Sequence, residues 1–562
     1  MLPGGVVQVR HVGHAVARSP CPRGAREATT IRGVTVPGRA GVRTPVLVAG
    51  GGPAGLAAAA ELSLHGVACI VIEPRAQVSH RRPRAKTTSI RTMEHLRRWG
   101  IADRLRAAAP LPVAWSQRVT FCESLSGRRI TDFDGAFGLR TERSEEFAEP
   151  GQQVPQPVVE EVLRAHLLAG PGAELRLGCA VTGVAQDRDG VTVMVRGQDG
   201  AAYPVRARYV LGCDGAGGVV REQIGARWTG WSDRRPNFNV VFRAPGLDTH
   251  LGPAVQYWVV GGPVTGVIGR LDLNGTWWAI FPGIDAGYGS SHAPELITGL
   301  IGRPAACEVL ATDPWEARML VADRFAAGRV FLAGEAAHVN PPWGGHGFNT
   351  SIGDAVNIAW KIAAVEHGWA PPELLASYAA ERRGVAEQTV ASAESNLRAL
   401  SGDLPADAAA IQRVKRFEFY SLGLVLGYSY AGSPLIQPGA SPPPAADSTT
   451  YRPAAQPGAR LPHAWFPDGT SLYDRLGTGF TLLGPAGGGT RLAARARGRG
   501  IPLTLAEPPP GYPWRDDFLL VRPDQHIAWR ASDPDGIDLD TATGRSQPNA
   551  GTPARNLPDR PR

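Results

Sequence analysis

Three glycines near residue 50 have the spacing of a turn that binds a phosphate group. They are Gly50, Gly52 and Gly55, and they enclose Pro53 and Ala54. The apolar segment 45–49 before them is typical of a buried strand, and the Ala- and Leu-rich segment after them is typical of a helix. In such a unit the first glycine permits the tight turn, the second lets the backbone approach a pyrophosphate, and the third lets the helix lie close to the strand. The amides and dipole of the helix N-terminus then hold the anion.

An acidic residue follows at the distance expected for binding a ribose. The segment 68–72 is predicted to be a second strand, and Glu73 comes directly after it. A carboxylate about 20 residues after the first glycine is the group that hydrogen-bonds a ribose diol. Strand, turn, helix and acid in this order predict a site for one dinucleotide. The sequence has no second fingerprint of this kind and no CxxC pair, so a nicotinamide cofactor must bind transiently, without a Rossmann domain of its own.

Two further segments each join an apolar strand to a glycine-containing turn. Residues 211–221 read LGCDGAGGVVR, and residues 330–338 read VFLAGEAAH and are followed by PPWGGHGFN at 341–349. With the first turn, they resemble the three signatures of the single-component flavoprotein aromatic hydroxylases, the family of para-hydroxybenzoate hydroxylase and phenol hydroxylase. The resemblance covers about residues 45–400.

The resemblance implies a cofactor, a reaction and a class of substrate. The cofactor is one non-covalently bound FAD, with NADPH or NADH as a transient co-substrate and O₂ as the oxidant. The implied reaction hydroxylates a small-molecule aromatic substrate through a flavin C4a-hydroperoxide, and a polycyclic natural product is the expected substrate. The motif positions that it implies to contact FAD are Asp214, Gly215, Arg221, Gly334, Glu335, Pro342, Gly345, Gly347, Phe348 and Asn349.

Three more positions are similar to residues that line FAD in this family. Arg82 and Arg84 lie in the loop that follows the second strand, and Gln156 opens the predicted helix 157–168. A solvated basic loop is an equally good interpretation of either arginine taken alone.

The sequence departs from the family pattern at positions that bear on catalysis. Position 335, usually Asp, is Glu here, and Gly218 stands where Ser is common. Lys86 falls where the phenol-hydroxylase branch carries a catalytic Asp, so the general base of that branch cannot be transferred. His338 and His346 could move protons near the flavin or could be hydrogen-bonded structural histidines. We therefore assign no catalytic base and no metal ligand.

Four predicted strands between the second and third motifs resemble the substrate-covering sheet of the family. They span 238–242, 255–260, 264–270 and 276–281. Trp258, Trp278 and Phe281 are candidates to line an aromatic pocket, although an aromatic residue on a strand is more often part of the core.

These patterns predict an α/β protein in which a Rossmann-like FAD-binding domain is interleaved with a mixed β-sheet substrate domain. The FAD domain is expected over 45–400, with the substrate sheet drawn from about 110–140 and 230–320. A connecting segment and Pro-rich linker cover 401–457, and a thioredoxin-like α/β domain covers 458–562. Because this last domain has no cysteine, it cannot perform thiol redox chemistry, and a structural or dimer-supporting role is expected.

Composition excludes several other classes. Residues 1–44, expected to be a disordered or mis-assigned extension, contribute six of the eight net positive charges, so the nearly neutral remainder offers no nucleic-acid-binding face. No apolar stretch is long enough for a membrane helix, and the six cysteines show no metal-ligand spacing. We expect a cytoplasmic enzyme, and a homodimer is possible.

Two alternatives remain open. The same scaffold can support a Baeyer–Villiger or epoxidising oxygenase, and a similar fold also occurs in non-catalytic FAD-fold binding proteins. The intact third motif, which faces the isoalloxazine in the family, favours an enzyme.

Overall fold

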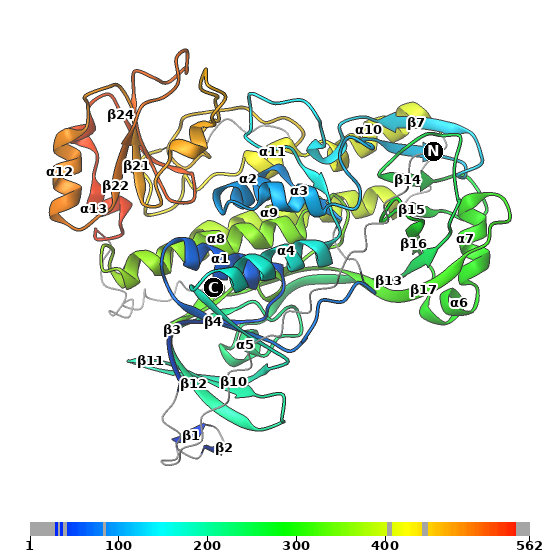
Figure 1. Cartoon of the computed structure of the whole chain (residues 1–562), viewed down its shortest axis with the longest axis horizontal. Coiled ribbons are helices and arrows are strands. Elements are labelled where there is room, and N and C mark those ends of the chain that lie inside the picture. The colour runs from blue at the N-terminus through cyan, green and yellow to red at the C-terminus, as the bar shows by residue number, and fades with distance from the viewer. Residues whose placement is uncertain are drawn as a thin grey trace, which may run out of the picture.

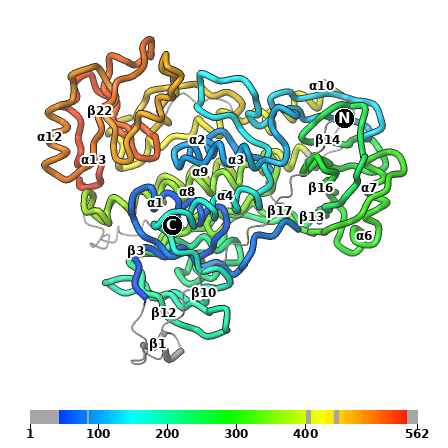
Figure 2. The backbone as a smooth tube through the Cα atoms, in the orientation of Figure 1, coloured from blue at the N-terminus to red at the C-terminus, as the bar shows by residue number. Residues whose placement is uncertain are grey.

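The computed structural model describes residues 29–31, 34–36, 42–82, 86–401, 407–440 and 448–546. A layer of helices lies between two large sheets and a C-terminal unit (Figure 1). The tube in Figure 2 shows the chain passing from one sheet to the other more than once, so the two sheets are interleaved in sequence. No helix in the described part of the chain is long and apolar enough to cross a membrane.

The first sheet has eight strands and a mostly parallel centre. Its main order is β10-β11-β12-β3-β4-β9; β19 pairs with β12 in parallel and β18 pairs with β19. The β3, β4, β9 and β12 strands are parallel neighbours, as in a dinucleotide-binding sheet. The bounds are β3 Val42–Ala49, β4 Cys69–Glu73, β9 Ala173–Leu177, β10 Ala180–Asp187, β11 Gly190–Arg196, β12 Ala202–Gly212, β18 Ala326–Ala327 and β19 Val330–Leu332.

Two helices are buried over most of their length and contact each other. In α1 the run of alanines lets the helix pack closely, and residues Ala54 to Leu62 are all buried. Helix α8 is buried over most of its length and contacts α1, α9 and η3. The bounds of the helices of this domain are α1 Pro53–Leu64, α2 Ile90–Arg98, α3 Ala102–Ala108, α4 Gln156–Ala169, α5 Val219–Gln223, α8 Gly347–Glu366, η3 Pro372–Ala376 and α9 Ser377–Ser401.

The second sheet covers one side of the helical layer. Its order is β20-β17-β13-β16-β15-β14-β6-β7, and helices α6 (Ala286–Ser291) and α7 (Ala293–Ile301) pack on its far side. The 15-residue strand β17, absent from the expected elements, pairs along most of β13. The bounds are β6 Val119–Cys122, β7 Arg129–Phe133, β13 Trp228–Arg243, β14 Gln256–Val259, β15 Gly266–Arg270, β16 Thr276–Pro282, β17 Glu308–Ala322 and β20 His338–Val339.

The two faces of this sheet belong to different hydrophobic cores. Trp258, Trp278 and Ile280 join the large core shared with the first sheet and its helices. Trp277 and Phe281 join a second core with α7, and α6 contacts β13 of the same sheet. Alternation along a strand produces this division, because successive side chains point to opposite faces.

The C-terminal unit is a small α/β domain. A parallel pair, β21 and β22, is linked by α12, and the antiparallel strands β23 and β24 extend the sheet in the order β22-β21-β23-β24. The bounds are β21 Phe480–Leu483, α12 Thr490–Gly498, β22 Leu503–Ala506, β23 Phe518–Val521, β24 Ile527–Ala531 and α13 Leu539–Ala542. The segment before it contains α10 (Ala408–Phe419) and α11 (Leu422–Leu426).

Buried charges join the C-terminal domain to helices α8 and α9. The fully buried Arg522, in the turn after β23, donates to both carboxylate oxygens of Glu381 on α9 at 2.7 and 2.8 Å. It also pairs with Asp524 at 2.6 Å, and Lys361 on α8 pairs with Glu381 at 2.7 Å. These buried ion pairs thus attach the C-terminal domain to helices α8 and α9.

The N-terminal region differs from the expectation. Residues 1–28 lie outside the described residues, whereas β1 (Thr29–Ile31) and β2 (Val34–Val36) pair as antiparallel strands, and β3 begins at Val42. The start of β3 at Val42 is three residues before the predicted strand, and the prediction of a disordered or mis-assigned extension over 1–44 stays a prediction.

Candidate functional site

The first glycine turn is closely packed at two positions and open at one. Gly50 has φ +101°, and a Cβ there would lie 2.3 Å from the Cys213 carbonyl oxygen. A Cβ on Gly55 would lie 1.9 Å from the Gly50 oxygen, which is why the helix needs glycine at this crossing. At Gly52, the N-cap of α1, a Cβ would meet nothing within 4 Å. The turn therefore leaves free space at the N-terminus of α1, where a pyrophosphate is expected.

Glu73 lies at the end of β4 beside this turn. Its carboxylate accepts hydrogen bonds from the Gly51 amide (2.7 Å) and from the Arg75 side chain (2.6 Å). Arg75 also pairs with Glu160 on α4 at 3.1 Å, and Glu160 accepts a bond from Gln156 at 2.8 Å. The structure therefore brings Glu73 and Gln156 into one network of hydrogen bonds and ion pairs beside the glycine turn.

The second motif also meets the first turn. Asp214 follows Gly212 of β12, and its Oδ2 caps α5 by accepting from the Val220 amide at 2.9 Å. Its buried Oδ1 has no hydrogen-bond partner among the described residues, and burial raises the pKa of this carboxyl. Gly215 has φ +82° and open space around its α-carbon. Arg221 points elsewhere: it is buried, donates to the Ala226 carbonyl at 3.1 Å and stacks on Trp228.

Gly218 explains how Asp214 is placed. Gly218 is the N-cap of α5 and cannot cap the helix through a side chain. A Cβ there would lie 2.2 Å from the Asp214 carboxyl carbon, so the glycine makes room for the aspartate that caps the helix in its place.

The third motif forms a turn, η2 (Gly334–Ala336), held from beneath by Asp354 of α8. Asp354 accepts from the Gly334 amide at 3.1 Å, from His338 at 2.8 Å and from Arg382 at 2.7 Å. These groups are buried, and the bond from His338 to Asp354 supports this turn, while the His338 Nδ1 is buried with no partner among the described residues. Glu335 is exposed at the top of the turn and has no hydrogen bond or ion pair with a described residue.

The N-terminus of α8 presents free backbone amides. Gly345 has φ +70° and its amide donates to the Pro342 carbonyl at 3.0 Å, which closes the turn before the helix. Asn349 fixes this turn to the strand β5 (Thr87–Thr88): its amide nitrogen donates to the carbonyls of Thr87 (3.0 Å) and Gly345 (2.6 Å). The first amides of the helix, on Gly347 and Phe348, have no intrahelical partner and lie at the positive end of its dipole.

These features fit a bound dinucleotide. Open space at Gly52 and Gly215, free amides at α1 and α8, and the unpartnered Asp214 oxygen all lie around the carboxyl edge of the first sheet. The side-chain amide of Gln153, on β8 (Gln152–Gln153), is also buried with no partner among the described residues. β8 pairs with β5, which Asn349 ties to α8, so this polar group lies on the same side.

Tryptophans gather between the third motif and the second sheet. Trp343 of the PPWGG turn lies 5.7 Å from Trp258 and 6.3 Å from Trp315, measured between ring centroids. Trp315 on β17 donates to Asn239 at 2.8 Å, whereas the ring nitrogens of Trp278 and Trp343 are buried without a partner in the described chain. Trp258 and Trp278 therefore lie on the side of the sheet that faces the cofactor motifs.

Phe281 does not join them. It belongs to the core on the opposite face, with Phe238 and helix α7. Phe281 therefore lies on the opposite face from Trp278, because residues 278 and 281 are three apart on one strand and point to opposite faces.

Of the two loop arginines that the resemblance places beside FAD, one lies among the described residues. Arg82 is largely exposed and pairs with Asp313 of β17 at 3.2 Å, joining the loop after β4 to the second sheet. Arg84 lies outside the described residues.

The structure adds three residues that were not on the expected list of contacts. Trp315 and Trp343 lie at the tryptophan cluster, and Lys86 places its ammonium 3.8 Å from the centre of the Trp278 ring. Trp343 lies within the third motif, so the sequence could have indicated that it is close to the site. The contact of Lys86 with Trp278 joins distant parts of the chain, and no feature of the sequence indicated it.

His346, the N-cap of α8, is buried, and burial lowers its pKa to about 4. It is therefore neutral at physiological pH and carries no charge beside the helix terminus. No cluster of residues able to hold a metal ion occurs within the described ranges.

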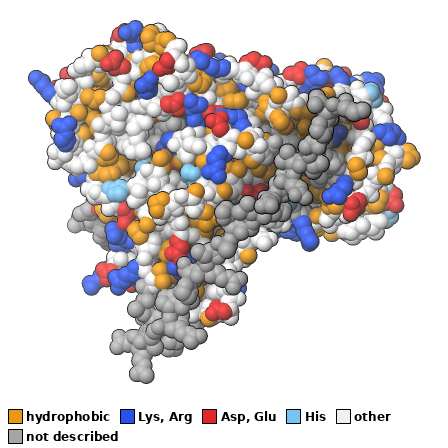
Figure 3. All heavy atoms as spheres, in the orientation of Figure 1, with side chains coloured by type: hydrophobic (Ala, Val, Ile, Leu, Met, Phe, Trp, Pro, Cys, Tyr) orange, Lys and Arg blue, Asp and Glu red, His pale blue; other side chains and the backbone are white. Residues whose placement is uncertain are grey.

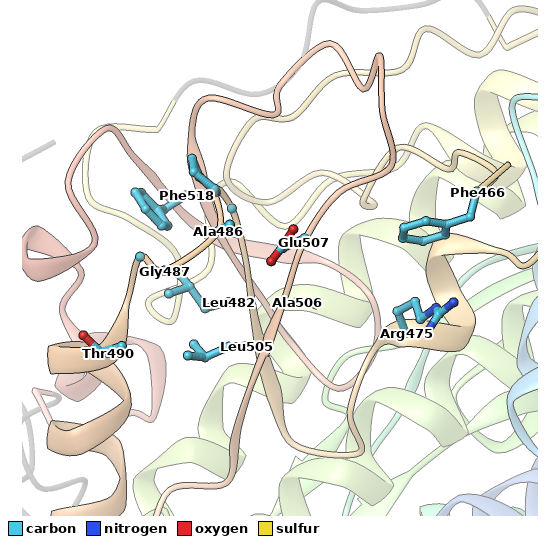
Figure 4. A pocket seen from close by; sticks show the side chains of 13 residues that line it. Phe466, Arg475, Leu482, Ala486, Gly487, Thr490, Leu505, Ala506, Glu507 and Phe518 are labelled. Carbon is cyan, nitrogen blue, oxygen red and sulfur yellow. The ribbon is translucent and has the colours of Figure 1, made fainter.

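A separate cavity of about 470 Å³ lies in the C-terminal domain. Figure 4 shows Leu482 and Leu505 from its paired strands lining it, with Phe518 and Glu507. All its lining residues come from residues 466–518, so it is not part of the site between the two sheets.

Comparison with known proteins identifies the two parts of the chain. Residues 43–393 match the model of the FAD binding domain family, and residues 454–548 match that of the aromatic-ring hydroxylase C-terminal domain. The chain is 32% identical to 2,4-dichlorophenol 6-monooxygenase of Delftia acidovorans, over 87% of this chain and 95% of that protein. It is also 32% identical to tetracenomycin B2 monooxygenase-dioxygenase of Streptomyces olivaceus, over 88% and 97%.

Solved structures agree. The flavin-dependent monooxygenase PieE, in complex with FAD and substrate, superposes with a TM-score of 0.80 at 30% identity, covering 90% of this chain and 98% of that one. Aklavinone-11 hydroxylase, in a ternary complex with FAD and aklavinone, gives a TM-score of 0.76 at 28% identity, covering 89% and 97%. The expected α/β fold with an FAD-binding domain and the expected cofactor FAD are thereby confirmed, and the chain belongs to the family of FAD-dependent aromatic-ring hydroxylases.

Proposed function

We propose that FAD lies along the carboxyl edge of the first sheet. Its pyrophosphate occupies the space over Gly52 at the N-terminus of α1, and Glu73 accepts from the adenosine ribose. The ribitol passes Glu335, whose exposed carboxylate has no other partner among the described residues. The pyrimidine end of the isoalloxazine faces the free amides at Gly347 and Phe348.

The amides at α8 suit this end of the flavin for an electrostatic reason. Reduction places negative charge there, and the N-terminus of a 20-residue helix carries partial positive charge. Asp354, beneath the neighbouring turn, is already neutralised by Arg382 and bonded to His338. It therefore does not oppose that charge with a free carboxylate.

The aromatic substrate is proposed to bind between Trp343 and the sheet face that carries Trp258, Trp278 and Trp315. Bound FAD supplies hydride acceptance from NADPH or NADH and the activation of O₂. The chain supplies the rest: indole faces orient the ring, and the buried aromatic cluster keeps water away from the reacting atoms.

A multi-ring phenolic natural product is the substrate that we favour. The sheet face that carries Trp258, Trp278 and Trp315, called the tryptophan face below, supports a multi-ring substrate. Relatives named for tetracenomycin B2 and aklavinone support it as well. A single-ring phenol is the competing substrate, in view of the relative named for 2,4-dichlorophenol.

Other flavin oxygenations remain as alternatives on this scaffold. A Baeyer–Villiger or epoxidation step would give products of the same mass, so product structure by NMR separates them from hydroxylation. A non-catalytic FAD-binding protein would be yellow but would not oxidise NAD(P)H in the presence of any aromatic compound.

We further propose a cytoplasmic location and a homodimer. The five described cysteines are free thiols, which suits a reducing compartment. On the face shown in Figure 3, basic and acidic side chains are interspersed over the described residues, as on a protein that does not bind nucleic acid there. Light scattering of the purified holoprotein tests the dimer.

The main test is substrate-stimulated NAD(P)H oxidation by the yellow holoprotein with a panel of phenols and polycyclic phenols. Incorporation of one ¹⁸O atom from ¹⁸O₂ into a ring carbon supports the proposal. Oxidation of NAD(P)H with hydrogen peroxide as the only product for every compound would contradict it.

A further inference from the structure

Lys86 is held at the boundary between the two sheets. Its carbonyl accepts from the Val154 amide at 2.7 Å, and the next residue, Thr87, is bonded to Asn349 at the N-terminus of α8. Its side chain crosses to the second sheet, where the ammonium lies 3.8 Å from the centre of the Trp278 ring. The backbone of Lys86 is thus fixed to the proposed flavin turn while its charge lies on the tryptophan face.

This ammonium has no carboxylate partner among the described residues. Asp313 of β17, an acidic side chain on this side, is paired with Arg82 at 3.2 Å. Burial alone lowers the pKa of Lys86, to about 8, and no charged neighbour contributes to that shift. The two other lysines of the chain differ in this respect: Lys361 is paired with Glu381 and Lys415 with Glu418, each at 2.7 Å.

A partly buried cation without a counter-charge is costly, and the cation–π contact with Trp278 compensates only part of the lost hydration. An anion bound against the tryptophan face would supply the missing partner. Among the described residues, the neighbouring side chains on this face include indole rings and the Asn239 amide, which is already engaged by Trp315. The aromatic surroundings favour an anion that is itself part of an aromatic ring.

We propose that Lys86 binds the ionised hydroxyl of a phenolic substrate and so selects phenols over their neutral analogues. The proposal rests on the substrate position argued above. The phenol O–H bond breaks, its proton passes to solvent or to a neutral Lys86 amine, and the bound state is an ammonium–phenolate pair. No electron is transferred in this step; the phenolate gains the electron density that an electrophilic oxygen attacks.

The test compares the holoenzyme with three variants. Lys86→Met removes the charge at nearly constant length, and Lys86→Arg keeps it. Arg81→Met is the matched control, because Arg81 is an exposed cation in the preceding loop. The probes are 4-nitrophenol and 2-hydroxyanthraquinone, each paired with its methyl ether, which cannot ionise.

Two quantities are measured without turnover: the dissociation constant of each probe, and the pKa of the bound phenol from the pH dependence of its phenolate absorbance difference spectrum. In the parent and in Arg81→Met, we expect the bound phenol to have a pKa about one unit below its free value, which corresponds to about tenfold tighter binding of the anion. Lys86→Met should lose both the shift and the preference for phenol over ether, and Lys86→Arg should retain much of both.

An unshifted phenol pKa in the parent, or no preference for either phenol over its ether, would overturn the proposal. An altered flavin reduction potential in Lys86→Met with unchanged phenol binding would also overturn it, because Lys86 would then act on the flavin. Failure of the proposed function is a separate result: phenols would bind as expected, but NAD(P)H oxidation would give no oxygenated product.

Discussion

Replacing Gly52 by valine separates cofactor binding from folding. Gly52 has φ −79°, which valine can adopt, and a Cβ there meets no atom within 4 Å. The β-carbon of an added side chain therefore has room in the protein without FAD. The cost to the apoprotein is that of a poorer N-cap, about 0.5–1 kcal/mol.

The same side chain occupies the space proposed for the pyrophosphate. It would separate the anion from the α1 amides, and loss of two hydrogen bonds to a charged group costs about 3–6 kcal/mol. FAD affinity should therefore fall by about 100-fold or more. Gly55→Val is the contrasting variant: its Cβ would lie 1.9 Å from a backbone oxygen, so the fold itself should fail.

The assay has two parts. Equilibrium dialysis or flavin fluorescence quenching gives the FAD dissociation constants, and chemical denaturation of apoprotein gives the stability of parent and variants. A Gly52→Val protein that binds FAD as tightly as the parent would refute the placement of the pyrophosphate. A variant that unfolds like Gly55→Val would refute the claim of free space at Gly52.

Three further predictions concern other parts of the site. If Glu335 accepts from FAD hydroxyls, Glu335→Ala should weaken FAD binding about 5- to 150-fold while Glu335→Asp retains it, and equal dissociation constants for Ala and parent would remove Glu335 from the site. Trp278→Leu should raise the dissociation constant for an aromatic substrate, whereas Phe281→Leu should lower stability without that effect; substrate titrations and thermal melts distinguish the two. Burial raises the pKa of Glu381, but Arg522 and Lys361 outweigh this and lower it to about 2. Since the ionised form is favoured in the folded state, stability should fall as the pH drops from about 4.5 towards 2, and acid titration of Glu381→Gln should show a shallower decline over that window.

The sequence by itself determined the strand–turn–helix unit that we propose to hold the pyrophosphate, because this unit is built from one local turn. The spacing of Gly50, Gly52 and Gly55 predicts a strand–turn–helix unit, and the structure has it as β3, the turn and α1. A backbone that turns sharply and approaches a phosphate restricts which residue types can stand at positions only a few apart in the sequence. The same holds for Gly345 and Asn349, which are bonded to each other within one turn.

Only the tertiary structure decided what the second sheet contributes. The strands 238–281 were predictable, but β17, the long partner of β13, brings Trp315 and Asp313 to the face from a distant part of the chain. The alternation rule could have separated Trp278 from Phe281; it could not have shown which of the two faces the cofactor motifs.

The contact of Lys86 with Trp278 shows the limit most directly. In sequence, Lys86 is a departure from a family pattern inside a basic loop. Its proximity to the tryptophan depends on the register of β13, β15 and β16 and on how Asn349 ties β5 to α8. Packing between two interleaved domains sets such distances, and no local periodicity encodes them.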